Sequence, residues 1–194
     1  MAEAKSRKGR APRRLTAQSL DNAALHYLER FAASSAHLRR ILLRKVARAA
    51  EAGMADRGEG ARLVEELIER YLAAGLLDDR AYAAQKGASL HRRGTSRYGI
   101  GGQLAKRGVP RELIAATLGD LADSGSDDLA AACALVRRRR LGPYRPAAER
   151  ETQHRRDLAA LARAGFSRDV ARRVLAAPDP AALERLARGE EPED

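Results

Sequence analysis

The sequence predicts an all-α fold built from three tandem three-helix repeats that form an elongated, curved array. Among its 194 residues are 41 Ala and 25 Leu, against only 6 Val, 4 Ile and 4 Thr, so residues that favour strands are scarce. Apolar residues recur at helical spacing along most of the chain, and one helix–corner–helix pattern occurs twice. Units of about 50 residues have small cores, so we expect neighbouring units to stabilise one another.

Residues 1–20 are predicted to be a disordered basic tail, because they show no apolar period. The cations of this segment are Lys5, Arg7, Lys8, Arg10, Arg13 and Arg14. Two interpretations stay open for it: a solvated extension that aids solubility, or an arm that contacts phosphates.

Residues 21–74 are predicted to form the first unit. Two short helices are expected around the break at Ser34 and Ser35, where a serine can cap the second helix. A third apolar stripe follows a glycine-rich interruption and ends at Gly75. The stripe residues are Leu25, Leu28 and Ala32, then Leu38, Ile41, Leu42 and Val46, and finally Leu63, Val64, Leu67, Ile68, Tyr71 and Leu72.

The second and third units, residues 75–123 and 127–177, share a repeated pattern. Residues 104–118 align without gaps on residues 161–175, with five of fifteen positions identical. Gly108 and Gly165 suit the left-handed conformation that ends a helix, and Pro110 and Ser167 suit the start of the next one. In the first unit Val46 stands in place of the corner glycine, which predicts a lengthened corner between Val46 and Gly60.

Residues 178–194 are predicted to be an acidic C-terminal tail with one short helix, and residues 124–126 a linker. The lone Cys133 lies in an Ala-rich run and is expected to be a small buried thiol. No apolar run is long enough for a membrane span, so we expect a cytoplasmic protein without membrane contact.

The composition favours a polyanionic partner, since 37 basic and 26 acidic residues give a net charge of +11. Residues 1–60 contribute most of this excess, with 13 basic and 6 acidic side chains. Nothing indicates an enzyme, a cofactor or a metal. The four histidines lack metal-binding spacing, and Gly99–Gly102 has neither the preceding strand nor the following Gly-Lys-Ser/Thr of a phosphate loop.

Basic residues at recurring helix-corner positions are therefore the candidate contacts to a partner protein or DNA. They are Arg39, Arg40, Arg44, Lys45, Arg92, Arg93, Arg97, Lys106, Arg107, Arg111, Arg163, Arg168 and Arg172. Such an edge could follow a phosphate backbone or the acidic groove of a protein filament. The alternative is that these cations form the ordinary solvated faces of amphipathic helices. The run Arg137–Arg140 is better explained as cations at a helix C-terminus, where they complement the helix dipole.

The sequence resembles the RecX regulators of the RecA recombinase. The matching segments are Ala24–Leu28, Ser35–Lys45, Gly75–Ala83, Arg92–Gly94, Ile100, Leu104–Val109 and Leu161–Phe166, which extend over about residues 20–177. The resemblance implies three tandem three-helix units in a protein without enzymatic activity, and we expect this protein to be a monomer. It also implies that the chain binds the RecA–DNA filament and inhibits its ATPase, strand-exchange and coprotease activities, so modulating recombinational repair and the SOS response. Single- or double-stranded DNA alone is expected to bind weakly.

Two further function classes stay open. Consecutive helices around a glycine corner also describe a sequence-specific helix-turn-helix regulator, with its recognition helix after Gly108 or Gly165. Leu113, Ile114 and Leu118 would leave the first of these helices few polar side chains for reading bases. An enzyme has no positive evidence in its favour.

Overall fold

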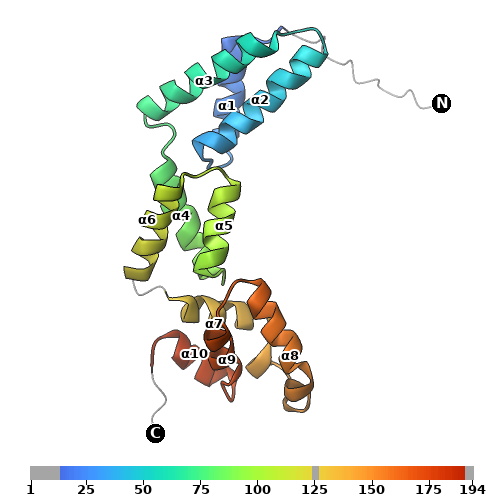
Figure 1. Cartoon of the computed structure of the whole chain (residues 1–194), viewed down its shortest axis with the longest axis vertical. Coiled ribbons are helices and arrows are strands. Elements are labelled where there is room, and N and C mark those ends of the chain that lie inside the picture. Colours follow the sequence, from blue (N-terminus) through green and yellow to red (C-terminus); the bar gives the residue numbers. More distant parts are fainter. Residues whose placement is uncertain (1–13, 124–126, 191–194) are drawn as a thin grey trace, which may run out of the picture. The chain divides into compact units, whose positions relative to one another are not determined.

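A computed structural model describes residues 14–123 and 127–190, and every regular element in these ranges is helical (Figure 1). The helices are α1 (Ala17–Leu28), α2 (Ser35–Glu51), α3 (Arg57–Ala73), α4 (Asp79–Arg92), α5 (Arg97–Lys106), α6 (Arg111–Asp123), α7 (Asp128–Arg139), the 3-10 turn η1 (Gly142–Tyr144), α8 (Ala147–Arg163), α9 (Arg168–Leu175) and α10 (Pro180–Ala187). The predicted all-α fold class is confirmed. Residues 1–13 of the expected tail, the linker 124–126 and the acidic end 191–194 lie outside the described residues.

The described helices bury three apolar clusters and form two compact units. The first unit, residues 14–78, encloses one cluster among α1, α2 and α3. The second, residues 79–190, encloses one cluster among α4, α5 and α6 and another among α7 to α10. Buried Leu, Val and Ala make up most of each cluster, so each core depends on small and medium side chains.

Helix α1 begins earlier than the expected tail allows. The Thr16 side chain caps α1 and accepts a hydrogen bond from the Ser19 N–H, while Leu20 is fully buried in the first cluster. The tail boundary at residue 20 is therefore wrong, because a cap and a buried leucine hold residues 16–20 in the fold. On the facing helix, the Tyr71 hydroxyl donates to Asp21 Oδ1 at 3.1 Å. Burial first, and then this hydrogen bond, raises the pKa of Tyr71 to about 12.

The corner between α2 and α3 is short, in contrast to the lengthened corner that the sequence predicted. Ser34 caps α2 as expected, but α2 continues past Val46 to Glu51, and α3 already begins at Arg57. The residues that were expected to form a long corner instead lengthen α2 and α3. Gly60 lies inside α3 against the Val46 side chain, where a Cβ atom would collide with the valine methyl groups, so the glycine permits close packing of α2 on α3.

The two predicted glycine corners are confirmed. Gly108 and Gly165 have φ angles of 78° and 86°, and the residues that follow them, Val109 and Phe166, are buried. Val109 and Phe166 also donate backbone hydrogen bonds to Leu104 and Leu161, the closure of a Schellman turn.

Two more corners of this kind went unrecognised in the sequence. Gly94 ends α4 with a φ angle of 78°, and the Thr95 N–H donates to the Leu90 carbonyl at 3.0 Å. At the end of α7, Arg140 takes the left-handed conformation with φ 52° in place of a glycine. The preceding arginines fill the last turn of α7, which confirms that the arginine run lies at a helix C-terminus.

The C-terminal cluster includes a fourth helix that the sequence had assigned to a tail. The short helix predicted after Pro178 is α10, but it packs against α7 and its Leu183 is fully buried, so residues up to 187 belong to the core and not to a tail. Leu183 is part of the apolar cluster that α7, α8 and α9 also form. Cys133 is buried in the same core as predicted, and its burial is the largest cause that raises the pKa of its thiol, to about 11.

A buried ion pair holds the turn η1 against α8. Asp157 is only 2% exposed and accepts from Arg145 Nη2 at 2.7 Å, from Arg145 Nε at 2.8 Å and from the Gly142 N–H at 2.9 Å. Burial alone raises the pKa of Asp157, but these hydrogen bonds outweigh it, and the pKa lies below its ordinary value of 3.8. Arg150 donates to the backbone carbonyls of Arg145, Pro143 and Pro178 and ties the same turn to the segment before α10.

Two helical glycines of the second unit should respond oppositely to substitution by alanine. Gly102 in α5 has open space at the Cβ position, so Gly102→Ala should stabilise the fold by about 0.5–1 kcal/mol. Gly87 in α4 faces Thr117 Cγ2 at 2.8 Å from that position, so Gly87→Ala should destabilise it by about 1–3 kcal/mol. Urea unfolding measures both changes, and equal shifts in the same direction would contradict this packing.

Asp157→Asn should lower the free energy of unfolding at pH 7 by about 3 kcal/mol, because it leaves Arg145 without its charged partner. The folded pKa of Asp157 is depressed, so its stabilisation is present above about pH 4 and is lost as the pH falls through the folded value. The unfolding curves of the two proteins should therefore converge in acid. The exposed pair Arg62–Glu66 supplies the control, and Glu66→Gln should cost less than about 1 kcal/mol. Persistence of the full difference in acid would rule out this role for the carboxylate.

Candidate partner-binding surfaces

Exposed cations of the first unit lie along one side of α2. Arg40, Arg44 and Arg48 are spaced four residues apart, and all three are exposed, as is Lys45. Residues four apart on a helix are neighbours, about 6 Å along its axis, so the three arginines form a row. We call this row, together with the adjacent Lys45, the α2 basic stripe. Arg48 was not among the predicted contacts, because α2 was expected to end near Val46.

Arg39 differs from its predicted neighbours on α2, since it faces α3. Its Nε donates to both carboxylate oxygens of Glu65, at 2.9 and 2.8 Å, and its side chain is only 34% exposed. This pair ties α2 to α3. Arg39 is therefore engaged inside the unit, while the α2 basic stripe is directed to solvent.

In the second unit, two helix corners meet. The α4–α5 corner (residues 94–96) contacts the α8–α9 corner (residues 164–167), and we call this contact the corner junction. Ser96 Oγ caps α5 by accepting from the Gly99 N–H at 3.1 Å, and it donates to the Ala164 carbonyl at 2.7 Å. Ser96 is fully buried, so one hydroxyl group satisfies a backbone donor of one corner and a backbone acceptor of the other.

The start of α7 contacts the same α4–α5 corner. The Arg97 N–H donates to Asp128 Oδ1 at 2.8 Å, and the buried His91 ring contacts the Asp127 carbonyl through Nε2 at 2.9 Å. A Cβ atom on Gly94 would lie 2.6 Å from the Leu135 nitrogen and 2.8 Å from the Ala131 carbonyl oxygen. Only a glycine fits at this position, where the corner approaches the backbone of α7.

The corner junction gathers basic residues that are distant in sequence. Arg92 and Arg93 precede Gly94 and are exposed, and Arg163 and Arg168 stand on either side of the α8–α9 corner, also exposed. Arg97 lies 4.0 Å from Asp128 through its Nε atom and so has an acidic neighbour. Arg138, which was not predicted as a contact, donates to the Arg93 carbonyl.

The other predicted cations lie apart from the corner junction. Lys106, Arg107 and Arg111 surround the α5–α6 corner, at the opposite end of α5, so the predicted residues of α4–α6 are divided between the two ends of one helix. Their side chains are exposed. Arg172 is exposed one turn after Arg168 on α9.

An exposed aromatic ring at the corner junction escaped the sequence reasoning. Tyr98 stands in the first turn of α5 and is 81% exposed. The available signal was an aromatic residue directly after the cations Arg92, Arg93 and Arg97. Its exposure could not be predicted, because the neighbouring Gly99, Gly101 and Gly102 obscure the helical period of α5, to which all three belong.

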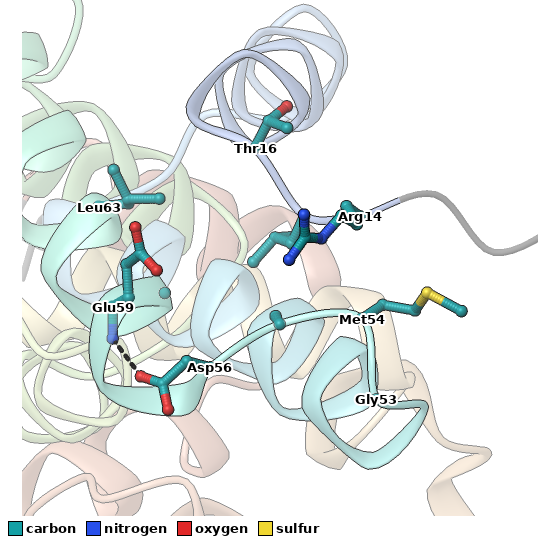
Figure 2. A pocket seen from close by; sticks show the side chains of 10 residues that line it. Arg14, Thr16, Gly53, Met54, Asp56, Glu59 and Leu63 are labelled. Atoms are coloured by element: carbon teal, nitrogen blue, oxygen red, sulfur yellow. Dashed lines mark hydrogen bonds between the residues drawn. The ribbon is translucent and has the colours of Figure 1, made fainter.

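A cavity of about 620 Å³ opens in the first unit between the start of α1 and the α2–α3 corner (Figure 2). Arg14 lies on one side, and Asp56 and Glu59 lie on the other, where Asp56 accepts from the Glu59 N–H as the cap of α3. None of the predicted contact residues lines this cavity. Across the described ranges, no group of three or more His, Cys, Asp or Glu side chains could hold a metal ion.

Two further observations bear on the alternatives. Leu113, Ile114 and Leu118 of α6 pack against the core of α4–α6, so the apolar side of this helix is occupied within the unit. Among the described helices, none is long and apolar enough to cross a lipid bilayer.

The chain is similar to a known protein family and to known regulatory proteins. The family model of the RecX second three-helix domain matches residues 78–118, which include α4, α5 and part of α6. The Regulatory protein RecX of Myxococcus xanthus (strain DK1622) is 42% identical over 172 residues, 88% of this chain and 91% of the relative. The proteins of that name from Agrobacterium fabrum and Trichlorobacter lovleyi are 37% and 35% identical over 52% and 57% of this chain, and over 52% and 71% of their own lengths. No solved structure matches.

The corner junction should be sensitive to a single methyl group at Gly94. Gly94→Ala combines a left-handed backbone with a collision against the α7 backbone, and should lower the free energy of unfolding by at least about 3 kcal/mol. Gly189→Ala is the matched control, because Gly189 has φ 74° but open space around its Cβ position, and should cost only about 1 kcal/mol. Chemical denaturation of both variants gives the comparison, and equal costs would show that the approach to α7 is unimportant.

Proposed function

The chain belongs to the RecX family of regulatory proteins, and we propose that it binds the RecA filament on DNA and inhibits the ATPase, strand-exchange and coprotease activities of RecA. Through this binding it lowers recombinational repair and the SOS response. The proposal gives the protein no catalytic step and no cofactor. It also places the chain in the cytoplasm, together with the filament.

The observation that carries this proposal is the similarity to the Myxococcus xanthus regulatory protein, which extends over 88% of the chain. A similarity of that extent includes both compact units and not one helical motif alone. The family match to residues 78–118 supports the same interpretation for the helices that supply one side of the corner junction.

The charge distribution supports a large anionic partner. The α2 basic stripe presents cations about 6 Å apart along one helix, so several can contact one anionic strand or acidic groove together. The corner junction presents further exposed arginines at the ends of α4 and α8 and the start of α9. Many weak contacts of this kind add up to tight binding only on a partner that is long and repetitive, such as a filament. Short naked DNA should therefore bind weakly and with steep salt dependence.

Binding alone accounts for inhibition in this proposal. A monomer seated on the filament hinders the changes between RecA subunits that accompany ATP hydrolysis and occludes the DNA that strand exchange must reach. Arg39 contributes by holding α2 on α3, while the α2 basic stripe makes the outer contacts.

The test is DNA-dependent ATP hydrolysis by the cognate RecA in the presence of the purified chain, with inhibition expected at or below one chain per RecA subunit. The variant Arg44→Gln/Lys45→Gln should raise the half-inhibiting concentration about tenfold, equivalent to about 1.4 kcal/mol of binding free energy. The control Arg57→Gln/Arg62→Gln removes the same charge from exposed positions of α3 and should change it little.

Two results would contradict the proposal. Uninhibited hydrolysis at a large excess of the chain would exclude a RecA inhibitor, and salt-resistant binding to one duplex sequence would instead favour the helix-turn-helix regulator. Equal effects of the two double variants would show that only net charge, and not the α2 basic stripe, controls binding.

A further inference from the structure

Tyr98 is the large apolar side chain with the greatest exposure among the described residues, at 81%, compared with 39–56% for Leu25, Phe31, Leu72 and Leu76. Several contacts hold the backbone segment that carries this ring. Its residue belongs to the first turn of α5, which Ser96 caps, and the Ser96 hydroxyl is bound to Ala164 across the corner junction. The backbone that carries the ring is thus tied to two corners.

Gly165 of the α8–α9 corner lies beside the ring. A Cβ atom on Gly165 would lie 3.0 Å from Tyr98 Cδ1 and 2.6 Å from Ser96 Oγ. The ring therefore lies beside the α8–α9 corner, with most of its surface still in contact with solvent. An exposed aromatic ring on a well-held backbone has only two side-chain torsions to order, so it can accept a second planar group with little loss of conformational entropy.

Exposed cations flank the two corners that meet beside this ring. Arg163 and Arg168 lie two and three residues from Gly165, on opposite sides of the corner, and Arg92 and Arg93 lie just before Gly94. Acidic residues are also present: Asp128 contacts Arg97, and Asp169 follows Arg168 in the first turn of α9. The exposed arginines outnumber these carboxylates, so the charge at the two corners is predominantly positive.

An aromatic face beside several guanidinium groups matches the chemistry of single-stranded nucleic acid, whose unpaired bases stack on the ring while the phosphates pair with the cations. A duplex offers the same phosphates but keeps its bases stacked inside, so it cannot use the ring without unstacking. We propose that Tyr98 is a stacking platform for one base of single-stranded DNA and that Arg163 and Arg168 contact the flanking phosphates. The assignment of a stacking residue, and with it a preference for single strands over duplex, goes beyond the proposed filament inhibition and concerns binding without RecA.

The absence of tryptophan from the chain permits a direct test. In full-length Tyr98→Trp the new indole is the only tryptophan, and an oligothymidylate of about 20 nucleotides should quench its fluorescence by stacking. An abasic oligonucleotide of equal length carries the same phosphates and should not quench it. Quenching by both, or by neither, would overturn the stacking proposal.

Affinity for the same oligonucleotide, measured by fluorescence anisotropy at low salt without RecA, tests the wild-type residue. Tyr98→Ala and Tyr98→Leu should each weaken binding about tenfold, whereas Tyr98→Phe should bind like the wild type, because stacking needs the ring and not apolar bulk. The salt dependence should be the same for Tyr98→Ala and the wild type. Arg163→Gln/Arg168→Gln should reduce its slope by about one to two units.

Two outcomes would overturn the proposal at this stage. Full affinity of Tyr98→Ala with intact helical circular dichroism would show that the ring does not contact DNA. Loss of RecA inhibition by the same variant with unchanged oligonucleotide affinity would identify Tyr98 as a protein-docking residue. Since the oligonucleotide assays contain no RecA, their result is separate from the test of filament inhibition.

Discussion

The backbone approach at Gly94 is the contact on which the arrangement of the second unit depends. Because this residue has no side chain, the α4–α5 corner reaches the backbone of α7, and the Ser96 hydroxyl and the Arg97 N–H then reach their partners on the neighbouring helices. The glycine at position 165 leaves room for the opposite corner in the same way. The two apolar clusters of this unit therefore meet at a polar boundary, where protein groups satisfy one another's hydrogen bonds. The same boundary fixes the backbone positions from which the nearby arginines extend.

The many arginines of the chain have two different roles. Arg145, Arg150 and Arg39 are committed to carboxylates or backbone carbonyls, where the planar guanidinium group satisfies several acceptors in a fixed geometry. Cations of the α2 basic stripe and those around Tyr98 are exposed. The net charge of +11 thus conceals a division between internal connectors and surface cations. Only the second class can contribute strongly to association with an anionic partner.

Local signals allowed the helical fold to be predicted, whereas tertiary contacts determined what was missed. Ser34, Gly108 and Gly165 act as predicted, because helix caps and left-handed glycines depend on a few consecutive residues. The short helix α10 was predicted, but its place in the core was missed, because its single fully buried residue, Leu183, gains its partner from α7 far away in sequence. For the same reason the pairing of Arg39 with Glu65 and the meeting of the two corners could not be inferred from spacing. Such contacts join segments that are far apart in the sequence, and the spacing of apolar residues does not indicate which distant segments meet.

Burial of Cys133 has a consequence for the chemistry of the whole chain. Its thiol has a pKa raised to about 11, chiefly by burial, so on the order of one molecule in ten thousand carries the thiolate at pH 7. Alkylating reagents and oxidants react with the thiolate, and they must also reach a side chain enclosed by the core of α7–α10. Modification of this residue therefore has to wait for the core to open. The rate at which this single sulfhydryl group is modified therefore reports how often the core of α7–α10 opens by local unfolding.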